Sequence, residues 1–169
     1  MTPASGERKK RVKRWLTFPG VLLALLIAAA IAIPNVLTSC CGSNESSATS
    51  TLRSLNTAMV TYSSTYERGF PDSLGKLGPP LAGQPDANNA DLVDPVMAGR
   101  GPGGTSNSFT RNGYKFVFTP GPGPRITTYV IHADPLERGV SGQRSFYTDE
   151  TAVIRANATA PATASDQPS

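Results

Sequence analysis

The sequence predicts an α+β fold in which one long N-terminal helix packs on a small four-stranded antiparallel sheet. Between residues 48 and 66 apolar side chains recur at spacings of three and four, which is typical of a helix with one buried face. After residue 110 the period changes to two, which is typical of strands. The chain also has 16 glycines and 15 prolines, which indicate long irregular connections. The helical stripe is Ala48, Leu52, Leu55, Met59, Tyr62 and Tyr66.

Composition limits the size and the chemistry of the folded part. A chain of 169 residues with 38% apolar residues has room for one modest domain and excludes a large two-domain enzyme. The net charge of +4 is concentrated in six basic residues between Arg8 and Arg14, and the remainder from Thr38 onward is almost neutral. We therefore expect no nucleic-acid partner. With a single histidine, His132, we also predict no catalytic or metal-binding residues, no cofactor and no small-molecule substrate.

The N-terminal region has the pattern of a membrane anchor. Residues 1–14 form a basic tail, and residues 15–38 lack charge and are mostly apolar. The run from Leu16 to Leu37 gives a helix of roughly 33 Å, enough to cross a hydrocarbon core of about 30 Å. The basic tail predicts a cytoplasmic N-terminus. The expected localisation is the bacterial inner membrane, in contact with lipid, with a single span and a periplasmic or extracellular C-terminal domain.

Residues 39–69 are expected to form an amphipathic helix that continues from the membrane span into the exported domain. Leu52, Leu55, Met59 and Tyr62 would form its packing face, because a stripe of this kind is more often part of a core than of a cofactor site. Pro34 would mark the weak point of the combined helix, since proline removes one backbone hydrogen bond and clashes with the preceding turn.

The rest of the chain divides into three predicted segments. Residues 70–109 are a connector rich in proline and glycine, residues 110–156 are the sheet, and residues 157–169 are a disordered tail rich in alanine, threonine and proline. The four predicted strands cover residues 114–119, 126–133, 144–148 and 152–156.

Cys40 offers a second mode of attachment. The run Leu37-Thr38-Ser39-Cys40 fits the bacterial lipobox, in which the cysteine thiol receives a diacylglycerol. Cys40 lies far from the basic tail, however, and Pro34 and Asn35 interrupt the apolar run that should precede it. The alternative hypothesis is thus an envelope binding protein that is anchored by lipid at Cys40 or by the membrane span.

Two runs in the helix resemble the type IV pilin-like proteins and the pseudopilins of type II secretion. They are Ile31-Ala32-Ile33-Pro34-Asn35-Val36-Leu37 and, after Asn44-Glu45-Ser46-Ser47-Ala48, Leu52-Arg53-Ser54-Leu55-Asn56-Thr57-Ala58. The resemblance implies a long helix packed under a small antiparallel sheet. It also implies a membrane-anchored structural subunit of a type IV pilus or a type II secretion pseudopilus, with no enzymatic activity. Its partners would be other pilin-like subunits and the assembly platform.

The chain departs from this family at the processing site. The family has a glycine before the prepilin cleavage point and a glutamate shortly after it, which guides subunits into the filament. In the register set by Pro34, Val12 occupies the glycine position and Thr17 the glutamate position. The resemblance therefore implies a minor or atypical subunit.

Overall fold

The computed structural model describes the backbone of residues 6–169, and the side chains of residues 20–23, 26 and 41–169. The chain divides into two compact units, residues 1–39 and residues 40–169. One helix, α1 (Gly6–Tyr66), contributes residues to both units. The hydrophobic core and the sheet belong to the second unit.

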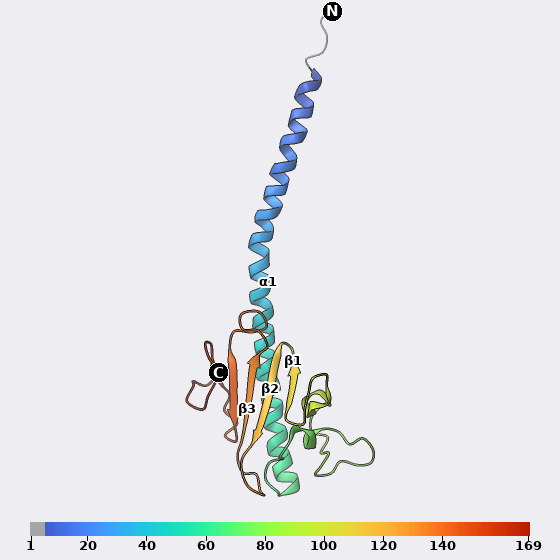
Figure 1. The fold of residues 1–169 in the computed structure, drawn as a ribbon, viewed down its shortest axis with the longest axis vertical. Helices are drawn as coiled ribbons and strands as arrows, with labels where there is room; N and C mark the ends of the chain where they lie inside the picture. Colours follow the sequence, from blue (N-terminus) through green and yellow to red (C-terminus); the bar gives the residue numbers. More distant parts are fainter. Residues whose placement is uncertain (1–5) are drawn as a thin grey trace, which may run out of the picture. The chain divides into compact units, whose positions relative to one another are not determined.

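The second unit contains an antiparallel sheet of five strands, whose order in space is their order in the chain. Figure 1 shows β1, β2 and β3 side by side along the C-terminal part of α1. In the register of the sheet, Phe116 on β2 lies opposite Phe109 on β1 and Ala133 on β3. The strands are β1 (Ser108–Arg111), β2 (Tyr114–Pro120), β3 (Tyr129–Pro135), β4 (Ser145–Asp149) and β5 (Arg155–Asn157).

The core lies between α1 and one face of the sheet. Alternate residues of β2 point inward, so Tyr114, Phe116 and Phe118 are buried while Lys115 and Thr119 are exposed. Aromatic side chains each remove a large apolar area from water when they are buried. The side chains of α1 that join this core are Ala48, Leu52, Leu55, Ala58, Met59 and Tyr62.

A tight turn sets the register of the first two strands. Asn112 and Gly113 connect β1 to β2, and both have positive φ angles, of 47° and 75°. Such angles are typical of the two-residue turn whose twist matches that of an antiparallel pair, and asparagine followed by glycine is its most favourable sequence.

Both edges of the sheet are covered. On one side β1 contacts η2 (Val96–Arg100), a short helical turn that packs with the 3-10 turn η1 (Leu74–Leu77). On the other side the C-terminal segment, for which the sequence predicts disorder, hydrogen-bonds along β5. The Ala156 amide donates to the Gln167 carbonyl at 3.1 Å, and the Ser169 amide donates to the Ile154 carbonyl at 2.9 Å. On the β5 side, this backbone pairing occupies groups with which another chain could otherwise pair.

The predicted fold class is wrong. The sheet has five strands and not four, because Ser108–Arg111 forms an additional strand at the end of the expected connector. That segment contributes only one apolar side chain, Phe109, and is too short to show an alternating pattern. The expected apolar half of the long helix is not shown either: no long apolar helix is found among the described residues. The helical side chains that pack in the core begin only at Ala48.

The prediction of a membrane-spanning helix is also wrong. Most side chains of the expected span, residues 15–38, lie outside the described residues. In the part of the chain that the structure describes, no helix combines the length and the apolar character needed to cross a bilayer. This finding contradicts the single-pass topology and the inner-membrane localisation that the sequence predicts.

The first prediction tests the packing of α1 on the sheet. Replacing Leu55, which is fully buried, with alanine should lower the free energy of unfolding by about 2–5 kcal/mol, because it leaves a cavity in the core. The matched control is Val60→Ala on the same helix. Val60 is 54% exposed, so the change should be within about 0.5 kcal/mol. Urea unfolding of the full chain, followed by circular dichroism, measures both, and equal losses would contradict the assigned face.

Candidate functional site

The predicted packing face of α1 is buried in the core of the second unit. Leu52, Leu55 and Met59 have no exposed surface, and Tyr62 is 4% exposed. The Tyr62 hydroxyl donates to the Ala87 carbonyl at 2.7 Å, and burial raises the pKa of this phenol. These four side chains therefore hold the helix to its own domain and do not form an exposed contact surface.

Two other predicted residues cannot be placed. The side chains of Pro34 and Cys40 lie outside the described residues. The neighbouring Cys41 is described: its thiol donates to the Val140 carbonyl at 3.1 Å.

A buried polar cluster, which the sequence pattern did not predict, joins the middle of α1 to the sheet. Asn56, only 6% exposed, donates from Nδ2 to Thr148 Oγ1 at 2.9 Å and to the Ala152 carbonyl at 3.2 Å. Its Oδ1 accepts a hydrogen bond of 3.1 Å from the Tyr129 hydroxyl. Burial raises the pKa of Tyr129, so the phenol remains a donor across the physiological range. The cluster uses both amide hydrogens and the carbonyl oxygen of Asn56, which satisfies the buried amide.

A carboxylate fixes α1 nearer its entry into the second unit. Glu45 Oε1 accepts from the backbone amides of Gln143 and Arg144, at 2.9 and 3.1 Å, and Oε2 pairs with Arg144 Nε at 2.8 Å. The Glu45 side chain is only 11% exposed. Burial alone would raise the pKa of Glu45, but the hydrogen bonds from Arg144 and from the two amides outweigh it, and the pKa is lowered. Glu45 is therefore ionised at neutral pH and ties α1 to the segment before β4.

A group of uncovered apolar side chains lies on α1 in the first unit. Val21, Leu22, Leu23 and Leu26 are each 59 to 61% exposed. Isolated apolar residues on a surface are ordinary, but several large exposed aliphatic side chains close together along a helix are a candidate contact surface. We call these four residues the apolar α1 segment.

The described histidine and two of the described acids make structural contacts. His132 on β3 lies with its ring edge toward Tyr147, the ring centres 5.4 Å apart. Within the described ranges there is no group of three or more histidine, cysteine, aspartate or glutamate residues that could hold a metal ion. The acids Asp94 and Asp149 accept hydrogen bonds from backbone amides in their own turns. These backbone contacts are those of turn-forming residues, and Asp94 Oδ2 also pairs with Arg111 Nη1 on β1 at 2.6 Å.

Comparisons with known proteins found no relative of this chain. It matches no protein-family model, no curated protein and no solved structure.

The second prediction concerns the Glu45 carboxylate. Glu45→Gln should lower the free energy of unfolding by about 1–3 kcal/mol at neutral pH, because it removes a charged acceptor from three hydrogen bonds. A depressed pKa contributes stability above the unfolded-state value of 4.5, and this contribution is lost as the pH falls through the lower folded value. The difference in the free energy of unfolding between Glu45→Gln and the wild type should therefore be largest above pH 4.5 and should shrink as the pH falls below it.

Urea unfolding between about pH 6 and about pH 3 measures this difference. Glu150→Gln is the control, because Glu150 is an exposed acid in the turn after β4. A Glu45→Gln effect that stays constant with pH would contradict the assigned role of the ionised carboxylate.

Proposed function

We propose that the chain is a pilin-like structural subunit of a type IV pilus or a type II secretion pseudopilus, in a minor or atypical position. The observation that carries the proposal is the apolar α1 segment, whose four aliphatic side chains are about 60% exposed. Exposed aliphatic surface of this kind is stabilised when another apolar surface covers it. In a filament, that surface would be the corresponding helix of a neighbouring subunit.

The second unit supports a structural role. Its largest apolar side chains pack between α1 and the sheet, and the buried polar side chains of Glu45, Asn56 and Thr148 bond α1 to the sheet or its loops. The part of α1 in the second unit is thus held to the sheet both by apolar packing and by buried hydrogen bonds. This is the arrangement that a subunit needs if its helix is to make the contacts and its domain is to remain folded during assembly.

The sequence departures support a minor or atypical position. Thr17 stands where the resembling family has a glutamate, so the chain lacks the acid that would pair with the N-terminal amine of a neighbour. Assembly with copies of itself should then be unfavourable. The partners proposed here are other pilin-like subunits that have this acid, together with the assembly platform.

The third prediction tests this function by cysteine crosslinking in the producing cells. In the full chain with Cys40 and Cys41 replaced by serine, a cysteine at Leu23 or Leu26 should crosslink to a second pilin-like protein and give few homodimers. The control is Leu81→Cys, because Leu81 is 93% exposed and lies in the connector of the second unit. Gel electrophoresis and mass spectrometry identify the adducts.

Two outcomes would contradict the proposal. A ladder made of this chain alone would show that it polymerises as a major subunit. Adducts at Leu23 and Leu26 no more abundant than those at Leu81 would show that the apolar α1 segment makes no specific contact.

A further inference from the structure

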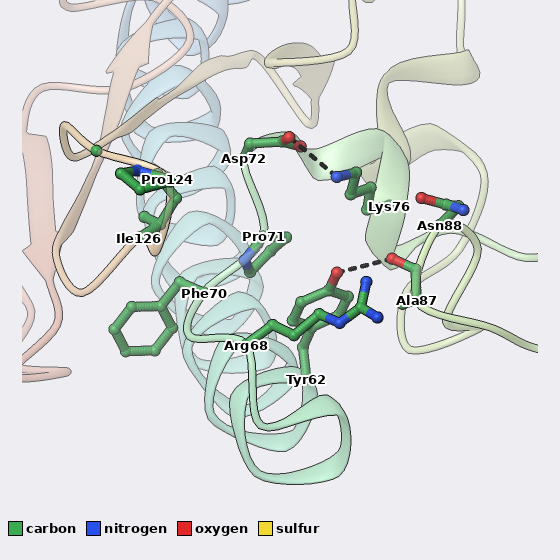
Figure 2. Close-up of a pocket in the computed structure, with 11 residues that line it drawn as sticks. Tyr62, Arg68, Phe70, Pro71, Asp72, Lys76, Ala87, Asn88, Pro124 and Ile126 are labelled. Atoms are coloured by element: carbon green, nitrogen blue, oxygen red, sulfur yellow. Dashed lines mark hydrogen bonds and ion pairs between the residues drawn. The ribbon is translucent and has the colours of Figure 1, made fainter.

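A cavity of about 330 Å³ lies in the second unit, where α1 ends and the connector begins. Its volume is at the lower end of the range typical of small-ligand sites. Figure 2 shows residues of its lining. Tyr62 comes from the end of α1 and Arg68 from the residues just after it. Pro71 and Lys76 come from the connector, and Ile126 comes from the segment before β3.

The charged side chains give the cavity one net positive charge. Lys76 Nζ pairs with Asp72 Oδ2 at 2.9 Å, so these two charges offset each other. Arg68 is different, because in the described part of the chain its guanidinium makes no ion pair and no hydrogen bond. An arginine that lines a cavity without a partner has five donors available, arranged as a planar fork that matches a carboxylate.

The other wall of the cavity is apolar. Pro71 is buried and Ile126 is 9% exposed. The ring of Tyr62 lies below them in Figure 2, and its hydroxyl is already bonded to the Ala87 carbonyl. This wall therefore offers carbon surface and no free hydroxyl, so it favours an apolar group.

Backbone and side-chain hydrogen bonds hold the rim in place. The Phe70 amide donates to the Ile126 carbonyl at 2.8 Å, which joins the two segments that carry the apolar wall. On the opposite rim the Asp86 carboxylate accepts from the amides of Asn88 and Asn89, both at 2.8 Å. This turn leaves the Asn88 side-chain amide without a partner among the described residues, so it adds a second polar group to the lining. A site held in this way loses little freedom when a ligand binds.

We propose that this cavity binds an organic monoanion in which a carboxylate is attached to a short apolar group. The carboxylate pairs with the Arg68 guanidinium and the Asn88 amide, and the apolar group packs on Pro71 and Ile126. A monoanion matches the single uncompensated charge, whereas a phosphate dianion would meet the Asp72 carboxylate with only one free cation. The ligand is a free organic acid or the C-terminal carboxylate of a peptide that ends in an apolar residue. This site is independent of the proposed filament role.

The fourth prediction tests the site with two acids and their amides. We expect 3-phenylpropionate or N-acetyl-alanyl-phenylalanine to bind the full chain with a Kd of about 0.1–1 mM, which is typical of a small ligand with one ion pair and one apolar contact. The corresponding neutral amides should bind at least about tenfold more weakly, because they lack the charge that pairs with Arg68. Nuclear magnetic resonance titration, observing the amides of Arg68, Asn88 and Ile126, measures all four constants.

Matched variants separate the ion pair from general charge. Arg68→Gln should weaken acid binding at least about tenfold, whereas Arg53→Gln, which removes the same charge from an exposed position on α1, should change it less than about twofold. Both positions are exposed, so neither change disturbs the core.

The two acids identify the source of the ligand. Tighter binding of the dipeptide acid indicates a peptide C-terminus, and tighter binding of 3-phenylpropionate indicates a free organic acid. The proposal is overturned if neither acid shifts these resonances at about 10 mM, if acids and amides bind equally, or if Arg68→Gln binds as the wild type does.

Discussion

The buried amide of Asn56 is the constraint on which the arrangement of the second unit depends. Its three hydrogen bonds reach β3, β4 and the turn after β4, so a small rotation of α1 would leave an unsatisfied amide inside the core. Glu45 provides a second fixed point about three helical turns earlier. Together they determine both the rotation of the helix and its position along the sheet, and apolar packing fills the space between them.

The sequence could predict the elements that have a local period. The stripe from Ala48 to Tyr62 and the alternation from Tyr114 to Phe118 identify side chains that are buried in the structure. It could not predict β1, where one phenylalanine gives no period. It also could not predict the polar anchors, because the partners of Asn56 and Glu45 lie between 73 and 99 residues away along the chain. One signal was present, since both residues fall in phase with the apolar stripe, where a polar residue must find a buried partner.

Because of this packing, different parts of α1 are buried in the core and exposed at the surface. The face that the sheet covers cannot also contact a neighbour, so the proposed association involves the apolar α1 segment, where aliphatic side chains are exposed. At the other end of the helix the chain turns away after Tyr66 through Glu67 and Gly69, which have positive φ angles. That turn places Arg68 at the cavity, so the same helix end that terminates the packing face also supplies the free cation.

Native-state hydrogen exchange tests most directly whether α1 and the sheet form one cooperative body held by these anchors. The account predicts that the backbone amides of Leu52, Asn56 and Ile131 exchange with the same free energy, equal to that of global unfolding, since none can open without breaking the Asn56 cluster. Exchange of the two helix amides at a free energy lower than that of Ile131 by about 2 kcal/mol or more would show that the helix detaches by itself, and would contradict the account.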